Sequence, residues 1–118
     1  MLIEQPARFL RLLYPHALWR MSAEERAVYL TFDDGPIPEA TPFILDTLDA
    51  FDAKATFFMV GGNVRKYPAL FDEVVSRGHQ VGNHTFHHLG SFKHWTLTYA
   101  VDVTKAQALI PSPYFRPP

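Results

Sequence analysis

Short apolar stretches typical of strands alternate with stretches of helical periodicity along most of this chain of 118 residues. The strand-like stretches are rich in β-branched and aromatic residues, and the helix-like stretches repeat apolar residues three and four positions apart. The expected strands are residues 27–32, 53–60, 80–83 and 114–116, and the expected helices are residues 41–51, 68–77 and 98–110. Such alternation predicts a parallel sheet or part of a (β/α) barrel, because parallel strands need a crossover connection that is usually a helix.

Turn-forming and capping residues set the boundaries of the expected helices. The first helix should have Thr41 as its N-cap and Pro42 at its first position, where a missing N–H costs nothing. The second should begin at Pro68 and stop at Gly78, and the third should stop before Pro111. The apolar faces expected to point inward are Ile44, Leu48 and Phe51, then Leu70, Phe71, Val74 and Val75, and finally Tyr99, Val103, Ala106 and Ile110.

The composition indicates one small globular domain, because 47% apolar and 14% aromatic residues are enough for a packed core. Eleven basic and twelve acidic residues leave a net charge of -1, which favours neither a nucleic acid nor an anionic membrane as partner. No stretch approaches the roughly 18 apolar residues of a membrane span. Since the chain has no cysteine, any metal must be held by His, Asp or Glu.

Residues 1–26 are expected to form a lead-in of one short helical turn plus coil, followed by a single domain over residues 27–118. The apolar stretch at residues 9–14 is interrupted by Arg11 and followed by Pro15, so it is too short and too charged for a secretory signal. The sequence as given therefore carries no secretory signal and is compatible with a cytoplasmic protein, and its location stays open. A leader outside this sequence would change that expectation.

Two adjacent carboxylates, Asp33 and Asp34, follow the first expected strand within the segment TFDDGP at residues 31–36. Binding and catalytic groups usually lie at this end of the strands in parallel α/β folds. Successive side chains of a regular strand point to opposite faces, so both acids share one site only if the backbone leaves the extended form, which Gly35-Pro36 favours. The alternative is a strand-to-helix turn in which the aspartates make local hydrogen bonds.

Five of the six histidines fall within residues 79–94. His84 and His88 are four positions apart, so on a helical turn or a tight loop their imidazoles could bind one cation. Two histidines and one carboxylate form a common open metal site. The alternative is a solvated His-rich loop. Three histidines are assigned ordinary structural roles, at the surface, in orienting or packing, and in an aromatic contact respectively: His79, His87 and His94.

Three blocks of the chain, in this order, resemble the polysaccharide deacetylase family, the NodB homology domain of carbohydrate esterase family 4. Residues 31–36 match the family's TFDDGP motif at every position, residues 84–88 match its His-Ser/Thr-x-x-His motif, and residues 115–118 resemble its third motif. Residues 55–61 also resemble the family's second strand, so the resemblance covers residues 27–118. It implies a parallel-stranded (β/α) barrel of the NodB type, present here as its N-terminal portion.

The resemblance also implies the chemistry of the site. Asp33 is implied to be the general base, Arg116 to pair with it and favour its ionised form, and Thr85 to support the loop. The alternative is that Arg116 is an ordinary surface arginine at the end of the chain and does not pair with Asp33. A divalent metal, most simply zinc, would polarise an acetyl carbonyl and activate water, so N-acetyl or O-acetyl groups of a glycan would be released as acetate. Three residues are implied to bind that metal: Asp34, His84 and His88.

The family's later motifs, an aromatic residue after the prolines, a Trp-bearing motif and a Leu-x-x-His motif that supplies the leaving-group acid, do not follow the third block here. Their absence predicts a metal-competent chain with weak or no activity. An unpaired sheet edge and uncovered helix faces predict self-association. Two alternatives stay open: a non-catalytic glycan-binding module that keeps the fold, and another metal hydrolase such as an amidase. Chitin, peptidoglycan and xylan are all compatible substrates.

Overall fold

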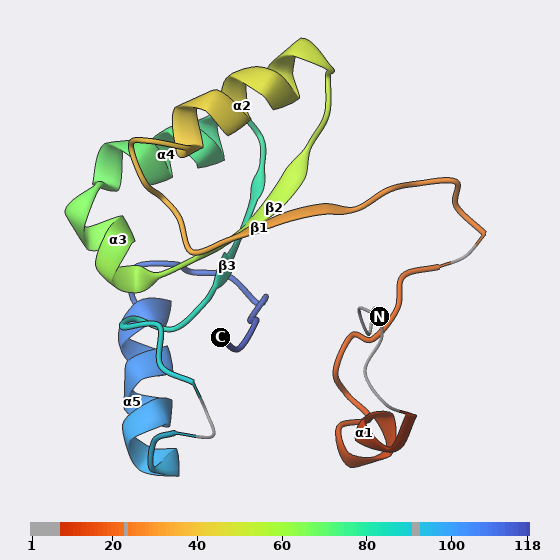
Figure 1. Cartoon of the computed structure of the whole chain (residues 1–118), viewed down its shortest axis with the longest axis vertical. Coiled ribbons are helices and arrows are strands. Elements are labelled where there is room, and N and C mark those ends of the chain that lie inside the picture. The colour runs from red at the N-terminus through yellow and green to blue at the C-terminus, as the bar shows by residue number, and fades with distance from the viewer. Residues whose placement is uncertain (1–7, 23, 91–92) are drawn as a thin grey trace.

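Three parallel strands form the sheet in this computed structural model, which describes residues 8–22, 24–90 and 93–118 (Figure 1). The strands, in their spatial order, are β1 (Leu30–Asp33), β2 (Ala55–Met59) and β3 (Gln80–Asn83). Asp33 at the end of β1 is opposite Phe58 of β2, and Met59 is opposite Asn83 at the end of β3. The carboxyl ends of the three strands therefore lie along one edge of the sheet, and the expectation of an α/β fold with a parallel sheet is confirmed.

Helices connect the strands. The helices are α1 (Arg8–Leu13), α2 (Thr41–Ala50), α3 (Gly61–Lys66), α4 (Pro68–Ser76) and α5 (Thr96–Gln107). In Figure 1, α2 and α4 lie side by side over the sheet, α5 follows β3, and α1 lies in the lead-in away from the sheet. No helix within the described ranges is long and apolar enough to cross a membrane.

The hydrophobic core lies between the sheet and the helices that follow β1 and β2. Alternate residues of β2 are buried in it and the residues between them are half-buried, so both faces of β2 are covered, as expected for a central parallel strand. Burying each large apolar side chain contributes roughly 1.5–3 kcal/mol. The core consists of Leu45, Leu48, Ala55, Phe57, Met59, Val64, Val74 and Ile110.

Several sequence predictions of element boundaries agree with the structure. β3 has the expected bounds, and α4 begins at Pro68 as expected. Gly78, with φ of 80°, takes the left-handed conformation that ends many helices. The expected fourth strand is present as a single parallel bridge between Asn83 and Phe115.

The first strand and the first helix differ from the predictions. β1 begins at Leu30 rather than at residue 27, and it is largely exposed rather than buried; Val28 before it is 85% exposed. The reason is that β1 is an edge strand, paired only with β2 among the described residues. In α2 the N-cap is Ala40 rather than Thr41. Phe51 is 78% exposed because the helix ends before it, and Leu45 is buried instead.

α3 is a helix that the sequence patterns did not predict. Gly61 begins the helix at a place where the chain passes very close to its neighbours. A Cβ at Gly61 would lie 2.8 Å from a ring carbon of Phe86 and 3.0 Å from Cβ of Ala106. The glycine therefore allows α3 to pack directly on the loop after β3 and on α5.

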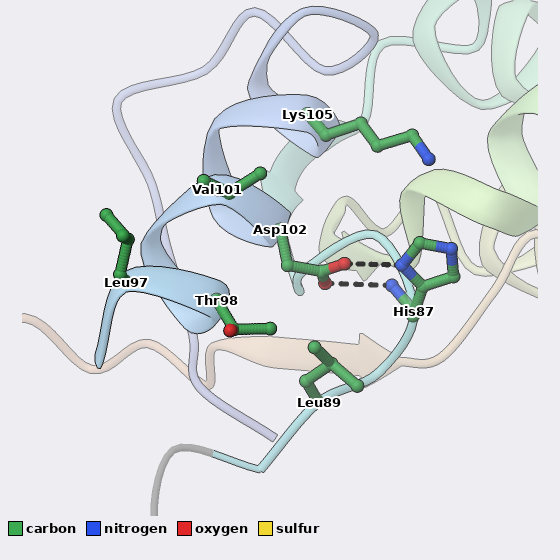
Figure 2. Close-up of a pocket in the computed structure, with 7 residues that line it drawn as sticks. All are labelled: His87, Leu89, Leu97, Thr98, Val101, Asp102 and Lys105. Atoms are coloured by element: carbon green, nitrogen blue, oxygen red, sulfur yellow. Dashed lines mark hydrogen bonds and ion pairs between the residues drawn. The ribbon is translucent and has the colours of Figure 1, made fainter. Parts of the chain in front are cut away.

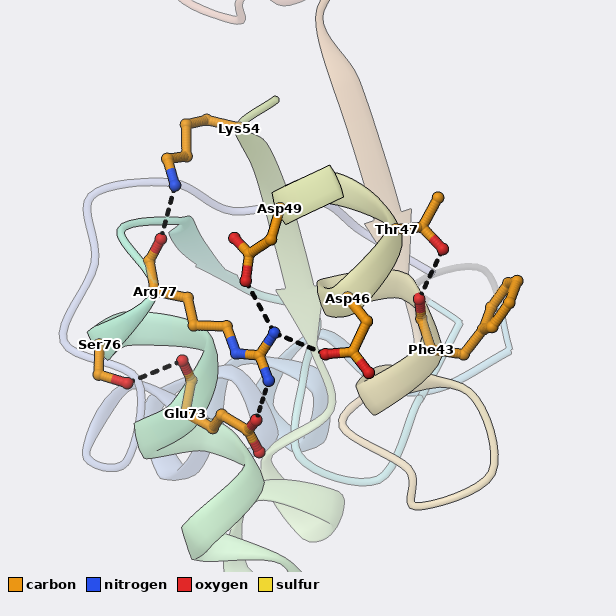
Figure 3. A network of polar contacts seen from close by, with 8 residues as sticks. All are labelled: Phe43, Asp46, Thr47, Asp49, Lys54, Glu73, Ser76 and Arg77. Carbon is orange, nitrogen blue, oxygen red and sulfur yellow. Dashed lines mark hydrogen bonds and ion pairs between the residues drawn. The ribbon is translucent and has the colours of Figure 1, made fainter. Parts of the chain in front are cut away.

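A network of ion pairs joins α2 to the end of α4 (Figure 3). The Arg77 guanidinium lies 2.8 Å from carboxylate oxygens of both Asp46 and Asp49 in α2, and 2.6 Å from Glu73 in α4. The hydrogen bond to Asp46, followed by those to the other acids, raises the pKa of Arg77 above its ordinary value. Such exposed pairs are individually weak, so this network supports the packing of the two helices without defining a site.

Candidate metal centre

The two carboxylates at the end of β1 are directed apart by the backbone. Asp33 is the last strand residue, whereas Asp34 has φ of 74° and lies outside the strand. Asp tolerates this left-handed conformation better than most residues. Two hydrogen bonds hold it: Asp34 N–H donates to the Phe58 carbonyl (3.1 Å), and Asn63 Nδ2 of α3 donates to the Asp34 carbonyl (2.7 Å). The chain thus leaves the extended form at Asp34, one residue before the predicted Gly35-Pro36.

His84 and His88 lie on the loop that follows β3. Thr85 and His88 have φ of 66° and 56°, so the backbone takes the left-handed conformation at two positions within five residues. The two imidazole rings come together with their centroids 5.2 Å apart. His84 is buried at the base of the loop, while the side chain of His88 is half exposed. The loop therefore brings two imidazoles together, one of them buried and the other half exposed.

Three ligand atoms converge at that point. Asp34 Oδ1 lies 3.3 Å from His84 Nε2 and 3.0 Å from His88 Nε2, and the ligand atoms of the three residues all lie within 4.8 Å of one another. Ligand atoms about 2.0–2.1 Å from one tetrahedral zinc ion would be about 3.3 Å apart. The spacing and the nitrogen–oxygen donor set therefore fit a divalent cation.

The tautomer of His84 also fits a metal ligand. Its Nδ1 lies 2.7 Å from the Arg116 carbonyl oxygen, which only accepts hydrogen bonds, so Nδ1 carries the hydrogen. In the neutral ring the lone pair of Nε2 then faces Asp34 Oδ1. Two acceptors at this separation repel each other unless a proton or a cation lies between them. Metal-binding histidines are commonly oriented by such a bond from the other ring nitrogen.

Asp33 is paired with Arg116, which lies 83 positions further along the chain. The Arg116 guanidinium donates to Asp33 Oδ1 at 2.8 Å and to Thr31 Oγ1 at 3.0 Å, and it lies 4.1 Å from the centroid of the Phe58 ring. Backbone bonds between Asn83 and the segment around Phe115 bring Arg116 to this position. The structure thus brings the predicted acid–arginine pair together beside the three ligand atoms.

Thr85 lies fully buried between the two histidines. Its N–H donates to Asn83 Oδ1 at 2.8 Å, and its hydroxyl accepts from the Leu89 N–H at 3.1 Å. These bonds connect the two ends of the loop. The supporting role of Thr85 stays a prediction, and these contacts suit it.

Sequence reasoning missed Asp102, which reaches the same loop from α5. Its carboxylate accepts hydrogen bonds from the backbone N–H groups of Phe86 (2.8 Å) and His87 (2.9 Å) and from His87 Nδ1. Burial raises the pKa of Asp102, but the hydrogen bonds from His87 and Phe86 outweigh burial and hold it below its ordinary value. A signal was present, since Asp102 is three positions after Tyr99 and four before Ala106, within the apolar stripe of the helix.

His79 was expected at the surface, and this prediction was wrong. Its side chain packs edge-on against Phe57, with ring centroids 5.4 Å apart, and the residue is only 6% exposed. Nδ1 accepts a hydrogen bond from the Ala55 N–H at 3.3 Å. Burial, followed by the nearby Lys54 ammonium, lowers the pKa of His79. His79 is therefore a core residue and takes no part in the metal centre.

Comparisons with known proteins show which proteins the chain is similar to. The family model described as polysaccharide deacetylase matches residues 20–118. A peptidoglycan-N-acetylglucosamine deacetylase of Bacillus cereus is 45% identical over 74 residues, which are 63% of this chain and 35% of that protein. A chitooligosaccharide deacetylase of Rhizobium leguminosarum bv. trifolii is 48% identical over 66 residues, covering 56% of this chain and 31% of that protein.

Solved structures show the same likeness. Peptidoglycan deacetylase PdaC from Bacillus subtilis matches with a TM-score of 0.74 and 33% identity, over 83% of this chain and 52% of that chain. A family 4 carbohydrate esterase from Streptomyces lividans, solved with acetate, matches with a TM-score of 0.71 and 30% identity, over 77% of this chain and 50% of that chain. The chain thus spans about a third of these curated relatives and about half of these solved chains.

Proposed function

We propose that this chain, which belongs to the polysaccharide deacetylase family, supplies the metal-binding and base-bearing part of a site that removes acetyl groups from a glycan. The observation that carries the proposal is the convergence of Asp34 Oδ1 with Nε2 of both His84 and His88, beside the Asp33–Arg116 pair. The names of the relatives favour an N-acetylated substrate of the peptidoglycan or chitooligosaccharide class, with an O-acetylated glycan as the alternative.

The metal-binding residues in this proposal are Asp34, His84 and His88. A divalent metal bound there, for which zinc is our first choice, would polarise the acetyl carbonyl and lower the pKa of a water molecule bound to the metal. The chain contributes the orientation of the ligands: the Arg116 carbonyl holds the ring of His84, and Asn63 holds the backbone of Asp34. The side chains of Asp34 and His88 are more than half exposed, so a substrate has access to the ligand atoms.

Asp33 is the proposed general base. Arg116 occupies its Oδ1, which leaves Oδ2 to take a proton from the attacking water. The water oxygen then bonds to the acetyl carbon, the carbon–nitrogen bond breaks, and the amine leaves with a proton, so the products are acetate and a free amine. In this scheme the protonated Asp33 returns its proton to the amine nitrogen as the carbon–nitrogen bond breaks, which balances the step. One carboxyl then serves as both base and acid, so we expect slow turnover by these 118 residues.

Zinc titration combined with acetate release under single-turnover conditions tests the proposal. The wild-type chain should bind one zinc ion and release acetate from N-acetylchitooligosaccharides or peptidoglycan fragments. Asp34→Ala should lose zinc binding, whereas Asp33→Asn should keep zinc and release acetate roughly 10²–10⁴-fold more slowly. Saccharide binding that is insensitive to chelator, without acetate release, would instead favour the glycan-binding module, and robust multiple turnover would contradict the expected slow rate.

A further inference from the structure

The loop that carries the two histidine ligands has a backbone that is unfavourable without support. Thr85 and His88, neither of them glycine, both adopt positive φ values. This conformation costs free energy in residues other than glycine, so it persists only where contacts with the surrounding structure stabilise it. At its N-terminal end the loop is held by Asn83, whose Oδ1 accepts from the Thr85 N–H. That bond does not reach the segment between Thr85 and His88.

Asp102 holds that middle segment from a different element. Its Oδ2 accepts from the backbone N–H group of His87 and its Oδ1 accepts from His87 Nδ1 (Figure 2). The same Oδ2 also accepts from the backbone N–H group of Phe86. The three bonds hold one orientation of the His87 ring and the N–H groups of two of the peptide units between the ligand-bearing residues. The carbonyls of the same two units, those of Thr85 and Phe86, accept from the N–H groups of Gly61 and Gly62 at the start of α3 (2.9 Å each). The loop therefore cannot turn His88 away from Asp34 without breaking bonds to a buried carboxylate.

Packing alone does not explain an acid at this position. Asp102 is 5% exposed and lies on the inner stripe of α5, where its neighbour one turn later, Ala106, is fully buried. A buried carboxylate is costly unless hydrogen bonds satisfy it. Here every donor comes from the loop, so the loop and the acid stabilise each other.

α5 is itself fixed relative to the sheet, so it provides a firm support. Asn83 Nδ2 at the end of β3 donates to the Val103 carbonyl (3.0 Å) and to Gln107 Oε1 (3.1 Å) of α5. The helix also packs against Gly61 at the start of α3. The positions of Asp102 and of the strand end are therefore linked.

From this arrangement we infer that Asp102 is a positioning residue, which fixes the loop so that His84 and His88 converge on Asp34. The inference rests on the proposed metal site. Asp102 does not touch the ligand atoms; it acts through the backbone of Phe86 and His87. Loss of its bonds should loosen the loop, which then keeps only the backbone bonds from Gly61 and Gly62 to its middle segment, and should weaken metal binding while the sheet and its core remain folded.

Two measurements on the full chain test this inference. The first is amide hydrogen exchange over residues 84–89 without metal, and the second is zinc affinity measured by competition with a chelating dye. The variants are Asp102→Ala, which removes all three bonds, and Asp102→Asn, in which one oxygen still accepts both backbone bonds. The matched controls are Asp72→Asn, the same chemical change at an exposed site on α4, and Ile110→Val, a core change away from the loop.

Asp102→Ala should bind zinc roughly 10–100-fold more weakly, as other orienting residues around metal ligands do. Its Phe86 and His87 amides should exchange faster, while the amides of β2 change no more than in Ile110→Val. Asp102→Asn should lie between Asp102→Ala and the wild type, and Asp72→Asn should match the wild type. Unchanged zinc affinity and unchanged loop exchange in Asp102→Ala would overturn the inference.

Two further outcomes keep the positioning role separate from the proposed function. Rapid exchange of the Phe86 and His87 amides in the wild-type chain would overturn the positioning role even if Asp102→Ala does not fold. A wild-type chain that binds no zinc would contradict the proposed function alone. In that case, faster loop exchange in Asp102→Ala would still support the positioning role.

Discussion

The Arg116 carbonyl oxygen lies 2.7 Å from His84 Nδ1, while the guanidinium of the same residue lies 2.8 Å from Asp33 Oδ1. One residue thus orients a candidate metal ligand through its backbone and holds the candidate base through its side chain. Both contacts depend on the parallel bridge between Asn83 and Phe115, which places the chain around residue 116 beside β3. The metal ligands and the base are therefore tied to one another through the order of the sheet.

Substitution of Arg116 should separate these two roles. In Arg116→Ala the backbone carbonyl remains, so zinc affinity should stay close to that of the wild-type chain. Asp33 loses its partner and its orientation, so acetate release should fall by about tenfold or more, a part of what a general base contributes. Zinc titration and acetate assays on the same preparation check this. Arg116→Lys should restore little, because one ammonium does not reproduce the planar contact with Asp33, Thr31 and the Phe58 ring.

The backbone of Asp34 should depend on Asn63. Asn63→Ala removes the 2.7 Å hydrogen bond to the Asp34 carbonyl, and the expected loss is about 0.5–1.5 kcal/mol of unfolding free energy. Zinc affinity should fall as well, because the left-handed conformation of Asp34 then has one support fewer. Urea unfolding with and without zinc measures both effects. An unchanged zinc affinity would show that the turn holds Asp34 without Asn63.

The sequence predicted the fold class because strand and helix periodicity are strong local signals, and they identified β3 and α4. The grouping of Asp34, His84 and His88 came from the resemblance of their motifs to the polysaccharide deacetylase family, and their ligand atoms lie together in the structure at the edge where the strands end. These features require only that apolar residues be buried and that parallel strands end on the same side.

Features that depend on tertiary contacts could not be predicted from local pattern. The exposure of β1 follows from its place at the sheet edge, and the burial of His79 follows from its packing on Phe57. Asp102 was overlooked because helical periodicity is judged from apolar residues alone. This acid is buried on the inner side of α5 because its carboxylate accepts hydrogen bonds from the loop after β3. A polar residue inside an apolar stripe is the sequence signal to follow in such cases.

Gly61 should not tolerate a side chain. In Gly61→Ala the new methyl group would lie 2.8 Å from the Phe86 ring and 3.0 Å from Cβ of Ala106, so the expected loss is about 1–3 kcal/mol of unfolding free energy. Thermal unfolding measures the loss. Gly90→Ala is the matched control, since among the described residues, its chain neighbours aside, no atom lies within 4 Å of a Cβ there. Equal midpoints for the two variants would contradict the close packing of α3 against the loop.

Stability should fall in mildly acidic solution because of His79. Burial lowers the pKa of His79 in the folded chain below its ordinary 6.5, so the ring takes up a proton less readily in the folded chain than in the unfolded chain. The contribution of His79 to the unfolding free energy is therefore fully present above pH 6.5, where the ring is neutral in both states. This contribution is lost as the pH falls from 6.5 through the lower folded pKa. His79→Gln should flatten the dependence of unfolding free energy on pH in that interval. His16→Gln, a change at an exposed histidine of the lead-in, should leave the slope unchanged.

The open edge of β1 should cause the chain to self-associate. Val28, Tyr29 and Leu30 are exposed next to a strand that is paired on one side only within the described part of the chain. An unprotected edge with apolar side chains offers both backbone bonding groups and apolar surface to another copy. Light scattering after size-exclusion chromatography should therefore give a mass above 13.5 kDa that increases with protein concentration.

A lysine at the edge should suppress this association, because a charged side chain there would be buried by strand pairing. Val28→Lys is therefore expected to shift the population toward the monomer. Phe51→Lys introduces the same charge at a similarly exposed apolar residue just after α2, so it should leave the association unchanged. If Phe51→Lys disrupts the oligomer and Val28→Lys does not, the contact is made by the surface around α2 and the edge-strand prediction is wrong.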